Sequence, residues 1–221
     1  MTHPAMRVVV LASGRGSNLG ALIAAQREPG ARFAIVLVAG DKPEAHALRI
    51  AEDAGIATIA LDPRGYADRA SFDTDLFARV AANAPDLIVL AGFMRILDPG
   101  VLAPWVGRMI NIHPSLLPKY RGLKTHERAI KAGDAVHGAS VHFVTPELDG
   151  GPVISQIEMP IEAGDTPTML ATRLLPLEHR LLAATVDMLA ERRVTLDGDA
   201  VRFDGAPLTQ PLRLAGQTLT A

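Results

Sequence analysis

The sequence contains no cysteine among its 221 residues. That absence excludes disulfide bonds, thiolate catalysis and zinc sites built on sulfur, and it fits a reducing compartment such as the cytoplasm. Aromatic residues are scarce as well, at 4% of the chain, although 48% of the residues are hydrophobic. Aliphatic side chains must therefore fill the core, and this composition favours a sheet that is covered by helices on both faces.

The sequence also lacks an excess of either charge, with 22 basic and 24 acidic residues and a formal net charge of −2. The overall charge is therefore not that of a nucleic-acid-binding protein or of a polybasic membrane-binding protein. No apolar run approaches the roughly 20 residues that span a bilayer, and residues 1–7 do not resemble a signal peptide. We expect a cytoplasmic protein, a monomer or a homodimer, that binds small molecules and neither nucleic acid nor membranes.

Short β-branched runs alternate with helical segments in the first part of the chain. We expect strands at residues 7–12, 33–39, 57–61 and 87–91, and helices at residues 17–27, 43–54 and 66–81. Ser17 or Asn18 is expected to cap the first helix, and Pro43 to stand at an early position of the second. This alternation predicts right-handed β–α–β crossovers on a parallel sheet.

The second part of the chain predicts a different order of elements. A strand at 108–112 is followed by a loop at 118–122, a helix at 125–132, two hairpin strands at 137–144 and 153–161, and a helix at 168–190. Pro176 lies inside the last helix and predicts a kink or a break there, and Asp197-Gly198 predicts a hairpin in the tail. The whole chain, residues 1–221, is expected to be one α/β domain. Its architecture is a Rossmann-like, open, mostly parallel sheet with helices on both faces and C-terminal antiparallel hairpin additions.

A glycine-rich loop, residues 14–18, separates the first strand from the first helix. Glycine lets the backbone approach a ligand closely, and the N–H groups at a helix start point toward an anion. The dinucleotide-binding pattern requires a glycine where this chain has Leu19, and no Walker lysine is present. A ribose phosphate or nucleoside monophosphate therefore fits better than NAD or ATP, and a plain strand-to-helix turn is the alternative.

Two polar residues, Asn111 and His113, end the strand at 108–112. Residues two apart in a strand point to the same face, and parallel sheets bind ligands beyond the carboxyl ends of their strands. An amide donor beside an imidazole can stabilise an oxyanion and move a proton, as acyl or formyl transfer requires. The alternative is that His113 is a hydrogen-bonded structural histidine.

A third polar residue, Asp149, lies in the glycine-rich turn between the two hairpin strands. A carboxylate in such a turn is commonly structural. If Asp149 faces His113, its charge raises the pKa of the histidine and favours the imidazolium.

Several segments, in this order, resemble the folate-dependent formyltransferases, and within them the glycinamide ribonucleotide formyltransferases of purine biosynthesis. The matching segments are residues 13–19 (SGRGSNL), 91–97 (AGFMRIL), 111–118 (NIHPSLLP), 142–151 (HFVTPELDGG) and 177–179 (LEH). The asparagine, histidine, SLLP and later aspartate are general to folate formyltransferases, whereas the glycine loop, GFMRIL and LEH single out this branch. The resemblance implies a ribonucleotide-binding half at about 1–100, a catalytic and folate half at about 101–192, and a tail hairpin at about 193–221.

The resemblance also implies catalytic roles and a mechanism. His113 is the general acid/base, Asn111 donates to the oxyanion, and Asp149 holds His113 charged and assists proton removal from the attacking amine. The co-substrate is 10-formyltetrahydrofolate, the acceptor is the amine of 5′-phosphoribosylglycinamide, and no metal is required.

Binding roles follow from the same resemblance. Backbone N–H groups of Gly16, Ser17 and Asn18 bind the ribonucleotide phosphate, and Glu178 binds the ribose hydroxyls. The folate is expected to contact one wall formed by Met94, Arg95, Ile96 and Leu97 and another formed by Thr145, Pro146, Glu147, Leu148 and Asp149. Arg69 and Asn111 complete the expected folate contacts.

Three positions depart from the family pattern. Lys124 replaces a histidine of some members, Leu175 is apolar where some relatives offer a basic or amide group, and Pro176 interrupts the helix that carries Glu178. These departures bear on affinity more than on reaction class.

Other functions remain as alternatives. A formyltetrahydrofolate deformylase would use water as acceptor and normally carries an added regulatory domain, and a methionyl-tRNA formyltransferase normally carries a further domain and a basic surface. A nucleotide-binding module without chemistry is the alternative from another class, and an NAD-dependent dehydrogenase has the wrong glycine spacing.

Overall fold

The computed structural model describes residues 4–216 and 218–221. The chain divides into two compact units, with the boundary between Asn111 and Ile112. The strand β5 (Met109–His113) crosses this boundary.

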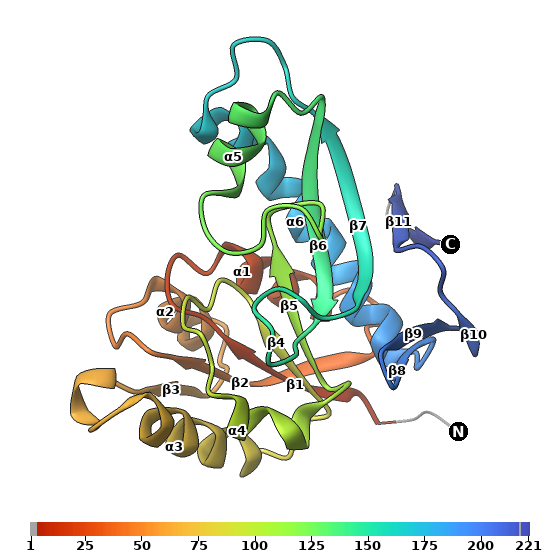
Figure 1. Ribbon diagram of the computed structural model, residues 1–221. Helices are drawn as coiled ribbons and strands as arrows, with labels where there is room; N and C mark the ends of the chain where they lie inside the picture. The colour runs from red at the N-terminus through yellow and green to blue at the C-terminus, as the bar shows by residue number, and fades with distance from the viewer. Residues whose placement is uncertain (1–3, 217) are drawn as a thin grey trace. The chain divides into compact units, whose positions relative to one another are not determined.

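The first unit is an α/β layer structure on a parallel sheet with the strand order β5-β4-β1-β2-β3. Helices α1 and α2 lie on one face of this sheet, and α3 and α4 lie on the other (Figure 1). The bounds are β1 (Met6–Leu11), α1 (Ser17–Gln26), β2 (Phe33–Gly40), α2 (His46–Asp53), β3 (Thr58–Ala60), η1 (Pro63–Gly65), α3 (Arg69–Ala81), β4 (Leu87–Leu90), α4 (Pro99–Leu102) and η2 (Ala103–Trp105). Val8, Val9, Val10 and Leu11 have no exposed surface, as expected of a central strand covered on both faces. The predicted Rossmann-like architecture is confirmed.

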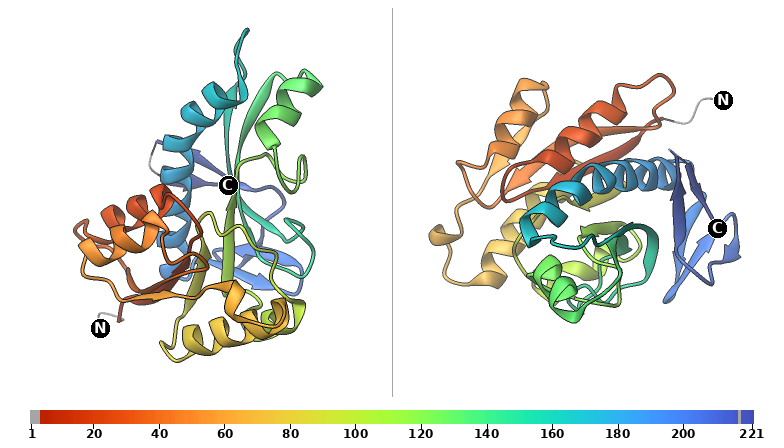
Figure 2. Two further views of the ribbon diagram at one scale, coloured as in Figure 1. Left: turned by 90° about the vertical axis from the view of Figure 1, so that its left-hand side faces the viewer. Right: turned by 90° about the horizontal axis from the view of Figure 1, so that it is seen from above.

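The second unit combines an antiparallel hairpin with a long helix. Strands β6 and β7 pair antiparallel, and α6 packs along them (Figure 1, Figure 2). The hydroxyl groups of Ser155 in β7 and Thr185 in α6 form a buried hydrogen bond of 2.7 Å at this contact. The bounds are α5 (Thr125–Ala132), β6 (Val136–Phe143), β7 (Val153–Pro160), α6 (Pro167–Ala190), β8 (Val194–Asp197), β9 (Ala200–Phe203), β10 (Ala206–Pro207), β11 (Leu212–Ala215) and β12 (Thr218–Thr220).

The tail contains more strands than the sequence predicts. The hairpin at Asp197-Gly198 is confirmed as β8 and β9, which form a small antiparallel sheet with β10. Beyond it, β11 pairs parallel with β7, and β12 pairs antiparallel with β11. These strands were not predicted, because each is only two to four residues long.

Several predicted helix ends are wrong. The N-cap of α1 is Gly16, with φ of 75° and no side-chain cap, so neither Ser17 nor Asn18 caps the helix. Pro43 lies before α2, which begins only at His46. The break that was one of the two outcomes expected at Pro176 does not occur, because α6 runs continuously past this residue.

The geometry of Gly16 explains the first of these differences. A Cβ atom at this position would lie 2.7 Å from the Cα atom of Ala47 in α2, too close for any side chain. The start of α1 is therefore set by the close approach of two helices, which sequence propensity does not show. Over the described residues, no helix has the length and apolar character that crossing a bilayer requires.

Candidate active site

The carboxyl end of β5 carries Asn111 and His113, two residues apart on one strand and therefore on the same face. His113 is buried, with 6% of its surface exposed, and Asn111 is half-buried. Asp149 lies in the turn between β6 and β7, and its Oδ2 atom is 3.4 Å from Nδ1 of His113. Asp149 therefore faces His113, an arrangement that the sequence alone left open.

The Asp149 carboxylate is held by groups that stabilise its charge. Its Oδ2 atom accepts a hydrogen bond of 2.8 Å from the backbone N–H of Gly122, and its Oδ1 atom lies 3.6 Å from Nε2 of His142. Burial alone raises the pKa of Asp149, but His142, the Gly122 N–H and His113 together lower this pKa to about 2. Asp149 is therefore an anion at neutral pH, and its backbone takes a left-handed φ of 47°.

His113 is placed between two acceptors. Its Nε2 atom lies 2.9 Å from the carbonyl oxygen of Tyr120, and its Nδ1 atom faces Asp149. Burial lowers the pKa of His113, and the Tyr120 carbonyl and the Asp149 charge only partly oppose this effect. Asp149 and the Tyr120 carbonyl therefore act on His113 in the direction that the resemblance implies, and burial acts against them. Both ring nitrogens can donate only in the imidazolium, so a developing negative charge nearby would favour proton uptake.

The segment that carries Tyr120 is fixed by its side chains. The Tyr120 hydroxyl donates to Asp134 over 2.7 Å, and the Arg128 guanidinium lies 5.1 Å from the centre of the Tyr120 ring. Lys119 forms an ion pair of 3.0 Å with the same Asp134 carboxylate. Lys124, one of the departures from the family pattern, instead pairs with Glu127 at 3.6 Å on the exposed surface.

The glycine loop has the backbone form of an anion site. Gly16 occupies the left-handed region, and no side chain caps α1. The first N–H groups of a helix have no partner within the helix, so Ser17 and Asn18 stand where an anion would bind. The loop is itself held by α2, because Gly14 O accepts the Ala47 N–H over 3.0 Å.

Glu178 is placed on α6 with only 8% of its surface exposed. Its neighbour Pro176 is exposed and lies within the same continuous helix, and Leu175 is half-buried. The departures at these two positions therefore leave the helix that carries Glu178 intact.

Residues 6–186 match the formyl transferase family. The chain belongs to this family. The phosphoribosylglycinamide formyltransferase of Escherichia coli strain K12 is 44% identical over 203 residues, which cover 92% of this chain and 96% of that enzyme. The trifunctional purine biosynthetic protein adenosine-3 of Bos taurus is 42% identical over 190 residues, 86% of this chain but 19% of that protein.

Solved structures agree with the assignment to the formyl transferases. The phosphoribosylglycinamide formyltransferase of Coxiella burnetii has a TM-score of 0.88 and 43% identity, covering 93% of this chain and 96% of that one. The glycinamide ribonucleotide transformylase 1 of Symbiobacterium toebii has a TM-score of 0.87 and 38% identity, covering 90% and 94%. The fold and the reaction class of this formyl transferase are therefore shown together.

The segments that the family resemblance assigns to folate lie in different units of this formyl transferase. In the first unit, Met94 and Ile96 are 64% and 56% exposed, and Arg69 pairs with Asp98 at 3.6 Å. In the second unit, Leu148 is 48% exposed, and Glu147 pairs with Arg121. Exposed apolar side chains at predicted contact positions are consistent with a surface that covers a ring system.

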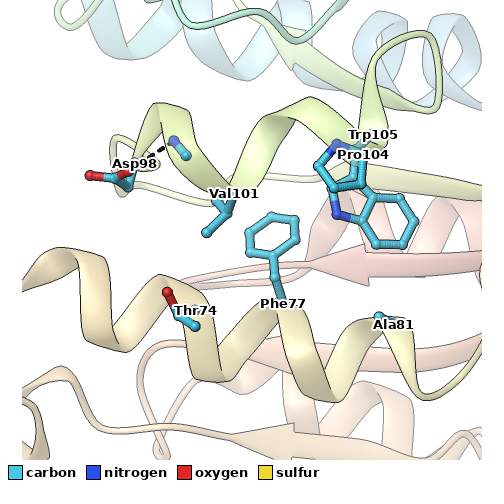
Figure 3. Close-up of a pocket in the computed structure, with 8 residues that line it drawn as sticks. Thr74, Phe77, Ala81, Asp98, Val101, Pro104 and Trp105 are labelled. Atoms are coloured by element: carbon cyan, nitrogen blue, oxygen red, sulfur yellow. Dashed lines mark hydrogen bonds between the residues drawn. The ribbon is translucent and has the colours of Figure 1, made fainter.

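A groove elsewhere in the first unit contains none of the predicted site residues. Phe77 and Ala81 of α3 face Val101 and Trp105 across it, and Asp98 lies at one end (Figure 3). Within the described parts of the chain, no group of three or more metal-ligating side chains is found.

Three residues that contact His113 or Asp149 were not predicted as site residues: Tyr120 contacts His113, and Gly122 and His142 contact Asp149. Tyr120 and Gly122 contribute backbone atoms, so their residue types carry no sign of the role. His142 lies in a motif typical of the formyl transferases. Ser140 and His142 stand two residues apart in β6, so their side chains point to the same face of this buried strand, and this was the available sign that His142 faces inward.

Proposed function

We propose that this formyl transferase moves the formyl group of 10-formyltetrahydrofolate to the amine of 5′-phosphoribosylglycinamide, in purine biosynthesis. The contact between Asp149 and His113 carries the proposal, because it pairs a buried acid/base with a fixed anion at a strand end. Sequence similarity to enzymes named for this acceptor supports it. The glycine loop supports a phosphorylated acceptor.

The proposed reaction begins when the substrate amine attacks the formyl carbon. The carbonyl π electrons move to the formyl oxygen. Asn111 donates a hydrogen bond to that oxyanion, and the positive charge of protonated His113 stabilises it. Asp149, through a water molecule, accepts the proton that the amine loses. The tetrahedral intermediate then collapses, the formyl C=O bond re-forms and the bond to the folate nitrogen breaks. That nitrogen takes up the proton that Asp149 accepted through the water molecule, and tetrahydrofolate leaves.

The remaining predicted residues bind the two substrates. The backbone N–H groups of Gly16, Ser17 and Asn18 bind the phosphate, and Glu178 accepts hydrogen bonds from the ribose hydroxyls. The segments 94–97 and 145–149 bind the folate together with Arg69. In this proposal residues 1–221 act as one domain of a cytoplasmic enzyme that is a monomer or a homodimer.

An absorbance assay for tetrahydrofolate, run with and without the ribonucleotide, tests the proposal. Product that depends on the ribonucleotide is the expected result, and equal product without it would indicate a deformylase. Replacing Asn111 by alanine should lower kcat by about 10²–10³-fold, since one oxyanion donor is lost. Asn83→Ala, which removes only a side-chain hydrogen bond to Arg79 O within the first unit, is the matched control.

A further inference from the structure

The loop between β4 and α4, residues 92–98, is held at its start by Ser13. The Ser13 side chain is 2% exposed, and its Oγ atom accepts the Met94 N–H over 2.9 Å. The Ser13 N–H donates to Gly92 O over 3.1 Å, and Gly92 has a φ of 74°. Ser13 therefore fixes both the turn at the end of β4 and the residue that follows it. Ser13 also directly precedes the glycine loop.

The other end of the 92–98 loop is held by Asp73, which lies in α3. Asp73 has no exposed surface, and its Oδ2 atom accepts the Asp98 N–H over 2.7 Å. Its Oδ1 atom has no hydrogen-bond partner among the described residues. Burying an aspartate costs free energy unless its carboxyl group is hydrogen-bonded or paired. Here the Asp98 N–H, at the end of the loop, supplies that hydrogen bond.

The middle of the 92–98 loop is fixed by one further contact. The Arg95 guanidinium lies over the ring of Phe72, 4.5 Å from its centre. Arg95 and Arg69 provide positive charge near Asp73, although burial outweighs them and raises the pKa of this aspartate. Between these fixed points, the side chains of Met94 and Ile96 extend into solvent. The loop thus has a held backbone and exposed apolar side chains.

We propose that Ser13 and Asp73 are positioning residues that hold the 92–98 loop in the shape that receives the folate co-substrate. The inference rests on the proposed function, which assigns this loop to the folate. Neither residue needs to touch the ligand, because each acts through a backbone N–H of the loop. When the loop is already ordered in the free enzyme, folate binding does not have to supply the free energy of ordering it. Loss of either contact should therefore weaken folate binding.

The experiment measures steady-state constants for Ser13→Ala, Asp73→Ala and Asp73→Asn. Ser13→Ala and Asp73→Ala should each raise KM for 10-formyltetrahydrofolate about tenfold, as expected for one lost hydrogen bond that leaves a backbone N–H unpaired. The KM for the ribonucleotide and kcat should change less than about threefold, because the acid/base residues are untouched. Asp73→Asn keeps an acceptor oxygen and should restore KM to within about threefold of the wild type.

Asp75→Asn is the matched control for Asp73. Asp75 lies one half-turn further along α3 and binds Tyr66 and Arg79 rather than the loop. An unchanged folate KM in both alanine variants overturns the inference, and so does a uniform loss of kcat with no change in KM. If Asp73→Ala does not fold, Ser13→Ala decides the question alone. Wild-type enzyme without ribonucleotide-dependent transfer would instead refute the proposed function, which separates the two failures.

Discussion

Replacing Asp149 by asparagine tests whether this residue acts on catalysis through His113. The change removes a negative charge whose Oδ2 atom lies 3.4 Å from the histidine Nδ1 atom. An opposite charge at such a distance raises a histidine pKa. The pKa of His113 is already lowered by burial, and removing the Asp149 charge should lower it further.

The kinetic consequence follows from the protonated fraction of His113. Above its pKa, each unit of decrease reduces the imidazolium fraction about tenfold, so kcat near neutral pH should fall by about tenfold or more. The measurement is kcat against pH, with the ribonucleotide and the folate both saturating. The falling limb of the profile should move to lower pH. Two profiles that superimpose after scaling would refute the reasoning. Asp197→Asn, which affects only an exposed pair with Arg202, is the control.

The same substitution has a separate effect on stability. The pKa of Asp149 is lowered from 3.8 to about 2 in the folded protein, so the folded state favours the carboxylate over the acid. This preference contributes about 2 kcal/mol to the free energy of unfolding at neutral pH. The contribution is fully present above about pH 4 and is lost as the pH falls toward 2. Urea denaturation at pH 7 should therefore show the variant to be less stable by about that amount.

Three further predictions concern the two units. Gly16→Ala should lower the free energy of unfolding in urea by at least about 2 kcal/mol, more than Gly30→Ala does. Both glycines have positive φ, but only a Cβ atom at Gly16 would clash with Ala47. Equal losses of stability in the two variants would contradict this reading. Burial first, and then His126, lower the pKa of His137 to about 4, so the free energy of unfolding should fall by up to about 3 kcal/mol between pH 7 and 4. His137→Gln should flatten that dependence in urea denaturation. Pro176→Ala should raise stability by about 1–3 kcal/mol through a restored helical hydrogen bond, seen as a higher urea midpoint.

The central strands could be predicted because their residues are apolar at successive positions, which indicates burial on both faces. The run of Val8, Val9 and Val10 is apolar on both faces, and only a strand between two helical layers tolerates that. The helix start at Gly16 could not be predicted, because it depends on Ala47 approaching from another helix. Likewise β11 pairs with β7 across more than fifty residues of sequence, and propensity carries no information about such a distant partner.

The candidate site shows the same division. Asn111, His113 and Asp149 were found from residue type, position at strand ends and family resemblance. The direction in which the pKa of His113 shifts could not be predicted. The sequence shows the Asp149 charge, which raises this pKa, but it does not show the burial that lowers it. Tyr120 and Gly122 make their contacts through backbone atoms, which every residue type has, so the sequence does not indicate these contacts.

The pairing of β11 with β7 determines which backbone groups at the edge of the sheet are left open to another chain. Leu212 and Arg213 occupy ladder positions beside Ser155 and Gln156, so the outer edge of β7 does not stand open at these residues. The segment that covers it lies beyond residue 186, where the match to the family ends. An uncovered strand edge is a template for another chain. The C-terminal tail thus covers β7 at Ser155 and Gln156, and the sheet ends at β12 instead.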